Sequence, residues 1–527
     1  MKSLLRLHPP GRIGASLLAA ISDCPPDKSI RRGCFILVGL AFALQLAVIW
    51  SVTFPPQHDT PGHMARHFLE AQHLFGGELP PFYEVQYRLL PNLGADLVVP
   101  PLMAVIEPLL ASKIFLSLAV VLYWLGPALF IWQYGGYKLS GLVSALLLLP
   151  LSFSNAFFWG FLNFYTSVGL AFVALFHFGA IAARPQPRVL DLVLHALLVT
   201  LLFFWHLAGF GIYGIVMAAQ MATRAWQRVR SRGRAPFWQC IWPQVLLGLP
   251  ALPAIGLFVL YSTGKTVQTD YWAPLWHKLL LPLYLFRTYD VAADLVFAAL
   301  WLGACLALVL GRQSLKSQEP WLWASMAGIL ALTLVVPTEW GSVYNADARF
   351  MPGLLVCVVC LGARLTQRRL LLAGGLLAAS LVVRYGSVHI EWTRLDQRLQ
   401  RVAAAFELFP EGSRIMPFTG GYTLTKNYPE TLFISWAIPL RAAYVPSVFA
   451  YEDQQPLKLK LQLPIHASLE GEQIVVNSEA ARADYDFVWI FNPKRLPVRI
   501  SPEFTKVFSE EHVTVWRAPP RPEDRVP

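Results

Sequence analysis

Residues 35–67 read FILVGLAFALQLAVIWSVTFPPQHDTPGHMARH. Residues 35–54 are mostly apolar, and about twenty residues is the length that an α-helix needs to cross the hydrocarbon core of a bilayer. The remainder opens with two prolines and then gathers titratable side chains: His58, Asp59, His63, Arg66 and His67. No small-residue cleavage site follows the apolar run. We therefore expect an uncleaved membrane helix that holds a polar cluster at one membrane surface.

The whole chain has the composition of an integral membrane protein. Of its 527 residues, 55% are hydrophobic and 14% are charged, whereas soluble domains carry about 25% charged residues. The formal net charge of +11 is compatible with nucleic-acid binding. However, the basic residues lie in short segments between apolar runs, where membrane topology explains them, so we expect no nucleic-acid partner. Six cysteines are too few for a disulfide scaffold.

Apolar segments that can span a membrane occur eleven times: 35–54, 112–134, 140–154, 162–182, 189–205, 207–222, 241–261, 292–311, 320–337, 350–363 and 370–385. The connecting segments on the side of the N-terminus hold nineteen Lys and Arg residues, and those on the opposite side hold six. Because positively charged loops stay in the cytoplasm, we expect a cytoplasmic N-terminus and an outer C-terminus. The predicted fold class is a polytopic α-helical membrane protein of about 11 transmembrane helices.

The sequence suggests three parts: a cytoplasmic tail over 1–34, a membrane domain over 35–385 that includes a first outer loop at 55–111, and an outer part over 386–527. Within the first outer loop, residues 93–110 are apolar but contain two adjacent prolines and two acidic residues. We expect this stretch to be a helix that lies in the outer interface without spanning the membrane.

The outer part predicts a small α/β domain. Apolar residues recur at steps of three and four over 391–408, which indicates an amphipathic helix. Strand-like runs follow, separated by turn-forming and charged residues, at 413–418, 473–476, 487–491 and 513–516. Cysteine is missing from this part, so a packed core must stabilise it.

Polar residues gather on the predicted outer side, and they include all the candidate site residues: His58, Asp59, His63, Arg66, His206, Lys265 and Arg349. Asp59 is either the N-cap of a helix over 62–74 or a functional carboxylate. The histidines at 58, 63 and 67 leave open a zinc site with Asp59. Arg349 can hold a phosphate or pair locally with Asp347. His206 is either a ligand of the site or a helix-ending residue.

This order of features resembles the GT-C superfamily of membrane glycosyltransferases, in particular its protein mannosyltransferase and aminoarabinose transferase branch. The residues that carry the resemblance are Asp59 after the first span, Arg66, Ala71, Gly77 and Pro80-Pro81, then Gly94 to Glu107, and Ala111-Ser112-Lys113. Many members have a second acidic residue beside the first, whereas here Thr60 and Pro61 follow Asp59. We therefore expect no metal and no other cofactor.

The resemblance implies a sugar donor linked to polyprenyl phosphate, and transfer to an envelope glycan, lipid or protein acceptor at the outer face of the membrane, expected to be a bacterial inner membrane. It implies Asp59 as the general base. Arg349, with Arg66 or Lys265, would bind phosphate, and the three histidines at 58, 63 and 206 would line the substrate. The alternative is a non-catalytic polytopic protein, such as a transporter or an assembly partner in polysaccharide export. Against a transporter, the sequence has no evident internal repeat and few charges in its span centres.

Overall fold

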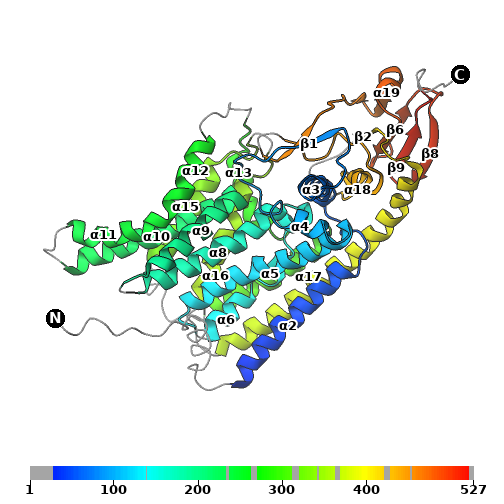
Figure 1. Ribbon diagram of the computed structural model, residues 1–527. Coiled ribbons are helices and arrows are strands. Elements are labelled where there is room, and N and C mark those ends of the chain that lie inside the picture. Colours follow the sequence, from blue (N-terminus) through cyan, green and yellow to red (C-terminus); the bar gives the residue numbers. More distant parts are fainter. Residues whose placement is uncertain are drawn as a thin grey trace.

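The structure is a computed structural model that describes residues 28–137, 139–184, 186–232, 237–262, 270–310, 320–340, 343–362, 368–420, 428–451 and 454–520. Figure 1 shows a bundle of long helices with a sheet-containing C-terminal domain at one end. We call this the domain-side end of the bundle. Lys265 lies outside the described residues.

Each predicted span lies on one helix or on a short series of helices. The long ones are α2 (Lys28–Trp50), α5 (Pro108–Tyr134), α8 (Leu162–Ala182), α9 (Val189–Trp205), α10 (Leu207–Arg232), α14 (Val291–Leu310), α15 (Pro320–Val335), α16 (Met351–Gly362) and α17 (Arg368–Ala403). Two spans are broken, into α6 (Leu139–Leu146), η1 (Pro150–Ser152) and α7 (Asn155–Trp159), and into α11 (Phe237–Gly248), η2 (Leu249–Ala251) and α12 (Leu252–Ser262). By length and composition, 6 helical stretches of the described chain can cross a membrane. The protein is therefore an integral membrane protein, while the number and sidedness of its spans stay predictions.

Small residues let the central helices approach one another closely. A Cβ atom added to Gly126 on α5 would lie 2.0 Å from the carbonyl oxygen of Gly169 on α8. One added to Gly169 would lie 2.2 Å from the carbonyl oxygen of Leu122. Because lipid provides little hydrophobic drive between helices, such close backbone packing is a main source of their association.

Helix α17 corrects the predicted boundary at residue 385. The predicted span over 370–385 and the predicted amphipathic helix over 391–408 form one continuous helix, extended by η5 (Ala404–Leu408). Its 36 residues reach about 54 Å, well beyond a hydrocarbon core of about 30 Å. The helix therefore runs from the bundle into the C-terminal domain, beside α2 (Figure 1). Its Asp396 accepts hydrogen bonds from the backbone N–H groups of Thr53 (2.8 Å) and Phe54 (2.7 Å), just after α2 ends.

The predicted interfacial helix over 93–110 is wrong in extent. Only α4 (Val99–Met103) is helical there, and α5 begins at Pro108. The preceding residues are instead fixed by α8, because the Asn163 side chain donates to Asn92 O (2.7 Å) and accepts from Ala95 N (2.5 Å). This loop conformation, with Asn92 at φ 78°, directs Asp96 into the protein.

The C-terminal domain contains all four predicted strands. Its main sheet has the order β2 (Ile415–Thr419), β6 (Phe487–Phe491), β9 (Val513–Arg517) and β8 (Thr505–Glu510), with β2 parallel to β6 and the other pairs antiparallel. A second sheet contains β4 (Ala467–Glu470), β5 (Gln473–Val476) and β7 (Val498–Arg499). The helical elements are η6 (Phe433–Trp436), α18 (Ala437–Arg441) and α19 (Ser478–Asp484). Every residue of β6 is buried, which explains its uninterrupted apolar sequence.

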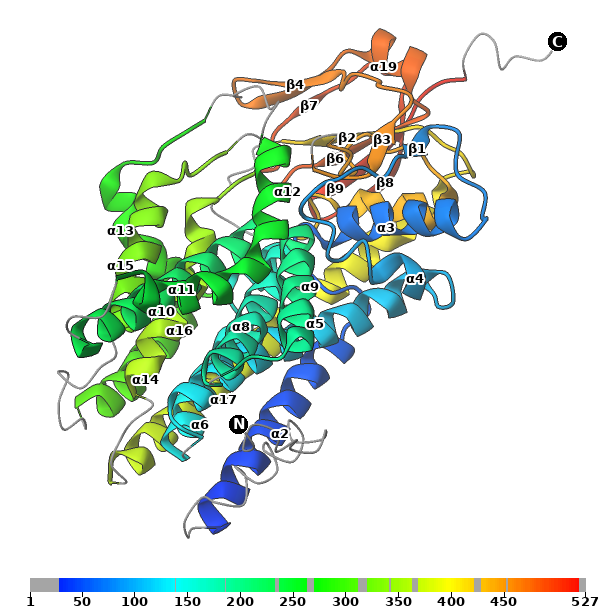
Figure 2. The same ribbon diagram turned by 60° about the vertical axis from the view of Figure 1, so that its left-hand side comes forward.

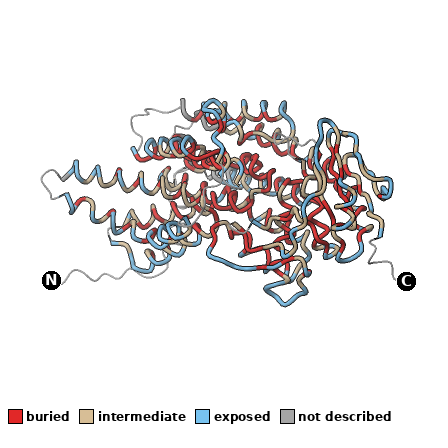
Figure 3. Tube along the Cα trace, turned by 90° about the horizontal axis from the view of Figure 1, so that it is seen from above, coloured by how far each residue is buried: buried red, intermediate tan, exposed pale blue. Residues whose placement is uncertain are grey.

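The first polar loop is built into this domain. Its strand β1 (Tyr83–Val85) pairs antiparallel with β3 (Leu457–Leu459), as Figure 2 shows. The hydroxyl of buried Tyr83 donates to Ala443 O (3.1 Å) and accepts from Val445 N (2.9 Å). Buried residues of bundle and domain belong to one hydrophobic core, and in Figure 3 the buried trace continues from one into the other. The loop and the domain therefore hold the helix α3 (Thr60–Leu74) between them and the bundle.

Candidate functional site

Asp59 lies on a backbone platform made by residues 157–160. The backbone N–H groups of His58 and Asp59 donate to Phe158 O (3.2 Å) and Trp159 O (2.9 Å), and the Gln57 amide donates to Phe157 O. Gly160 has φ 80°, and a Cβ there would lie 2.9 Å from Thr60 N. A side chain at 160 is therefore excluded twice, by the left-handed backbone and by the close contact.

The Asp59 side chain does not cap α3, although the residue occupies the N-cap position. Its Oδ1 instead pairs with His58 Nδ1 at 2.6 Å. The His58 ring packs on Trp159, with 4.7 Å between ring centroids. The capping interpretation is thus wrong for the side chain, and its carboxylate is available for another role.

Arg349 lies in η4 (Asp347–Phe350), directly before α16. Its Nη1 is 2.8 Å from His206 Nε2, and its Nη2 donates to Tyr344 O (3.2 Å). The guanidinium lies over the rings of Phe161 (4.8 Å) and Phe164 (5.6 Å). Its Nε is buried without a hydrogen-bond partner.

No carboxylate of the described residues lies within ion-pair distance of Arg349. The local pair with Asp347 does not form, because Asp347 accepts from the Thr338 hydroxyl (2.7 Å) and lies 3.6 Å from Lys278 Nζ. Burial lowers the pKa of Arg349 to about 10, while the negative charge of Asp59 opposes that shift. The arginine therefore remains a cation at neutral pH, and a half-buried cation without a carboxylate partner has unused capacity for an anion.

Arg66, the other arginine candidate, is already neutralised. Its Nε is 3.1 Å from Glu70 Oε1, its Nη2 is 3.0 Å from Asp96 Oδ1, and its side chain is fully buried. Its Nη1 contacts His63 Nδ1 at 3.3 Å. Arg66 thus fixes α3 against the loop that carries Asp96, which makes it a poor phosphate ligand.

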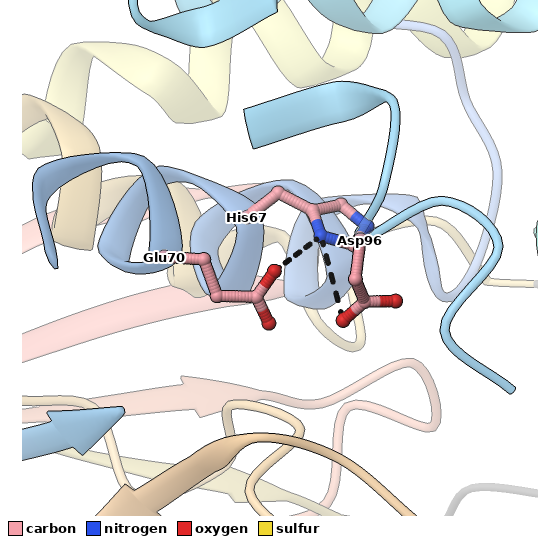
Figure 4. Close-up of side chains that lie close together, drawn as sticks. All are labelled: His67, Glu70 and Asp96. Carbon is pink, nitrogen blue, oxygen red and sulfur yellow. Dashed lines mark hydrogen bonds and ion pairs between the residues drawn. The ribbon is translucent and has the colours of Figure 1, made fainter. Parts of the chain in front are cut away.

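His67, Glu70 and Asp96 form a buried group with metal-ligand chemistry (Figure 4). His67 Nδ1 is 3.2 Å from Glu70 Oε2 and 3.9 Å from Asp96 Oδ1. Arg66 already supplies a positive charge to both carboxylates. The zinc set left open by the sequence, His58, His63 and His67 with Asp59, is not assembled, because among the described residues the ligand atoms that lie within 4.8 Å of one another are those of His67, Glu70 and Asp96.

The charges of this buried group explain its protonation. Burial raises the pKa of Asp96 to about 7, against the attraction of Arg66, and burial also raises the pKa of Glu70. Burial lowers the pKa of His67 to about 3, with Arg66 acting in the same direction. Two carboxylates with a single cation and a neutral imidazole carry a net negative charge, so a proton on one carboxylate is favoured near neutral pH.

Two aromatic residues of the C-terminal domain reach the same region. The Phe449 ring stacks on His63 at 4.4 Å between centroids, and a Cβ on Gly62 would lie 2.9 Å from Phe449 Cε2. The Tyr451 ring follows at 6.2 Å from that of Phe449. Partial burial raises the pKa of Tyr451, and the charges of Asp59 and Tyr344 act in the same direction.

Comparisons with known proteins were made for the whole chain. No protein-family model matches it, and no curated protein does. Solved structures of membrane glycosyltransferases resemble it in fold. The arabinofuranosyltransferase AftD from Mycobacteria superposes with a TM-score of 0.48 and 12% identity, over 96% of this chain and 40% of AftD.

ArnT from Cupriavidus metallidurans superposes with a TM-score of 0.47 and 11% identity in the apo state, over 93% of this chain and 100% of ArnT. The structure of ArnT bound to undecaprenyl phosphate superposes with a TM-score of 0.46 and 12% identity, over 92% of this chain and 99% of ArnT. The chain therefore spans less than half the length of AftD and a length similar to that of ArnT. These likenesses concern the fold, so the function is argued below from the side chains of this chain.

Besides Arg66, which contacts His63, the structure brings five sequence candidates to one region at the domain-side end of the bundle: His58, Asp59, His63, His206 and Arg349. Arg349 interacts electrostatically with His63 and with Asp59, although it lies far from both in sequence. We call these five residues the Asp59 site. Sequence reasoning missed Phe449 and Tyr451, because nothing in their local pattern shows that the C-terminal domain folds back onto α3.

Proposed function

We propose that the protein is a membrane glycosyltransferase that takes a sugar from a polyprenyl-phosphate-linked donor. The observation that carries the proposal is that Arg349 has no carboxylate within ion-pair distance among the described residues and lies in the field of the Asp59 carboxylate. Asp59 and Arg349 interact electrostatically at the domain-side ends of membrane helices, where the phosphate of a membrane-bound lipid lies. The fold likeness to a transferase bound to undecaprenyl phosphate is in accord with such a donor.

The proposed reaction uses the two charges at opposite ends of the bond that breaks. Asp59 accepts the proton of the acceptor hydroxyl, and that oxygen attacks the anomeric carbon of the sugar. The bond between this carbon and the phosphate oxygen breaks, and Arg349 stabilises the charge that develops on the leaving phosphate. A single carboxylate acting as base, without a covalent intermediate, predicts inversion at the anomeric carbon.

His58 and His206 then act as positioning residues. His58 Nδ1 holds one oxygen of Asp59, which leaves the other oxygen for the acceptor hydroxyl. The His206 ring limits where the guanidinium can lie, and the Phe161 and Phe164 rings below it exclude water. A dry site strengthens the attraction between Arg349 and a phosphate.

The Asp59→Asn variant tests the proposal. Loss of a general base reduces rates by roughly 10²–10⁴-fold. Because the Asp59 side chain makes no capping hydrogen bond, the variant should keep its thermal stability in detergent. Glu78→Gln, which removes an exposed carboxylate from the same loop, is the matched control and should transfer at the normal rate. The measurement is transfer from a polyprenyl-phosphate sugar to a membrane-extract acceptor. Near-normal turnover by Asp59→Asn would remove Asp59 from the mechanism.

The non-catalytic alternative makes a different prediction for the same variants. A transporter or an assembly partner would bind its lipid or glycan without breaking the bond between sugar and phosphate. Purified wild-type protein would then leave every polyprenyl-phosphate sugar intact, and Asp59→Asn would behave like Glu78→Gln.

A further inference from the structure

The C-terminal domain contains a cavity of about 530 Å³, which is large enough for several sugar rings. Its walls are residues of β2 and β3, the residues directly before η6, and the segments that follow α18 and β3. The polar side chains among them are Thr419, Thr431, Ser447 and Gln462, and the remainder are prolines, leucines and one isoleucine. None of the described residues that line the cavity is charged. It therefore favours an uncharged ligand that has both hydroxyl groups and apolar faces.

Two of these polar groups have no hydrogen-bond partner among the described residues. Thr431 Oγ1 and Ser447 Oγ are buried and make no hydrogen bond within the described chain. A buried hydroxyl without a partner costs free energy, so such groups call for an explanation. A ligand with hydroxyl groups in the cavity would supply partners after a rotation of each side chain about χ1.

One short segment of chain connects the cavity wall with the Asp59 site. Pro446 and Ser447 line the cavity, Phe449 stacks on His63, and Tyr451 follows. Four residues of chain reach at most about 14 Å, so Ser447 and Tyr451 lie within the length of a short oligosaccharide. Leu432, another wall residue, would lie 3.6 Å from a Cβ on Gly62, three residues after Asp59.

Tyr451 is suited to contact a sugar ring. Its side chain is 48% exposed, although its ring packs near Phe449. The apolar face of a sugar ring packs well on an aromatic ring, and the phenol provides a hydrogen bond at its edge. The Tyr451 ring, next to the Phe449 ring that stacks on His63 of the Asp59 site, is thus available to hold the unit that reacts.

We infer that the cavity of the C-terminal domain binds an uncharged oligosaccharide acceptor, whose terminal sugar packs against Tyr451 beside Asp59. This inference rests on the proposed function and specifies its acceptor as a carbohydrate. The transfer step remains the one described above: the terminal hydroxyl loses its proton to Asp59, its oxygen bonds to the anomeric carbon, and the lipid phosphate leaves.

The first test is binding to the full-length protein in detergent, measured by saturation-transfer NMR. The probes are maltotriose, mannotriose and arabinotriose, with trigalacturonic acid as the charged control. At least one neutral trisaccharide should bind more tightly than the charged one. No binding of any neutral trisaccharide at millimolar concentration, or equal binding of the charged control, would overturn the inference.

The second test compares variants of the cavity wall. Thr431→Val replaces the hydroxyl by a methyl group of nearly the same size. Because that hydroxyl is unpaired, stability should stay equal or rise, whereas trisaccharide affinity should fall by roughly 2- to 12-fold, the equivalent of one hydrogen bond. Thr419→Trp should fill the cavity and abolish binding. Leu469→Trp, on an exposed strand of the same domain, should change neither property. Wild-type affinity in both Thr431→Val and Thr419→Trp would overturn the inference.

The third test separates the acceptor site from the chemistry. Tyr451→Ala should raise the acceptor KM by roughly 2- to 12-fold, and Tyr451→Phe should restore most of it, because stacking needs only the ring. Lipid-phosphate binding should not change in either variant. A wild-type protein that binds the trisaccharide but transfers no sugar would remove the proposed function and leave the cavity assignment intact. Normal transfer with an unchanged acceptor KM in Thr419→Trp would remove the cavity assignment and leave the proposed function intact.

Discussion

Arg349 Nη1 lies 2.8 Å from His206 Nε2, across the ends of two helices that are 143 residues apart in sequence. His206 Nδ1 also accepts a hydrogen bond, from Ala208 N (3.0 Å). A neutral imidazole carries one N–H, so its two nitrogens cannot both accept. The contact between Arg349 and His206 is therefore a weak substitute for an anion, and a phosphate would offer the guanidinium better acceptors.

This relationship gives a prediction with an unusual sign. Arg349→Gln should leave stability unchanged or raise it, because it removes a half-buried cation that no carboxylate of the described residues neutralises. Transfer should fall by roughly 10²–10³-fold, as for the loss of a donor to a developing oxyanion. The measurements are melting temperature in detergent and initial rate. Arg394→Gln, on an exposed part of α17, is the control. A large loss of stability together with normal turnover would make Arg349 structural.

Gly160→Ala tests the backbone platform below Asp59. A Cβ there would lie 2.9 Å from both Thr60 N and Thr60 Oγ1, in addition to the strain of φ 80°. Gly76→Ala is a matched control, because Gly76 has φ 78° and open space around it. Both variants should lose about 1–2 kcal/mol of stability from the left-handed backbone. Only Gly160→Ala should also lose most of its transfer activity, and equal activity in the two variants would contradict the platform.

Asp96→Asn tests the shared proton of the buried group around Arg66. The folded pKa of Asp96 is raised to about 7, so its contribution to stability is present below the unfolded pKa, near 4, and is lost as pH rises to about 7. The pKa of His67 is lowered to about 3 in the folded protein. Its contribution to stability is therefore lost as pH falls below about 6.5, which is the opposite trend. The stability of the wild-type protein, plotted against pH, therefore combines two opposing slopes.

The comparison between variant and wild type isolates Asp96. The melting temperature of Asp96→Asn, relative to wild type, should increase from pH 4 to pH 7, because an amide cannot ionise. Arg66 would then pair with Glu70 alone, one charge of each sign. Scanning calorimetry in detergent at several pH values measures this difference. A difference that stays constant with pH would mean that Asp96 does not hold the proton.

Reporter fusions test the predicted sidedness. A fusion after residue 230 should report the cytoplasm, because basic residues dominate that segment. Fusions after residue 80 and at the C-terminus should report the opposite side. Since β1 pairs with β3, the first polar loop and the C-terminal domain must lie on the same side. Different reports from these two fusions would contradict the structure itself.

The sequence was sufficient for features that depend on local composition and periodicity. Each predicted span lies on a helix, and the four predicted strands are present, because an apolar run or a period of two is set by neighbouring residues. The sequence was less reliable for the ends of an element that passes from the membrane bundle into the C-terminal domain. Helix α17 passes from the bundle into the C-terminal domain without a break, and the change in its composition was interpreted as a boundary.

For the site, the sequence by itself identified which residue types could act, and only the tertiary structure decided which of them are free to do so. Arg66 and Arg349 look equivalent in sequence, yet Arg66 is neutralised by Glu70 and Asp96, and Arg349 faces His206 and two aromatic rings. Asp59 could have capped α3, yet its side chain pairs with His58. These outcomes depend on contacts between segments far apart in the chain. Such contacts follow from packing between helices and domain, and no local pattern of residues encodes them.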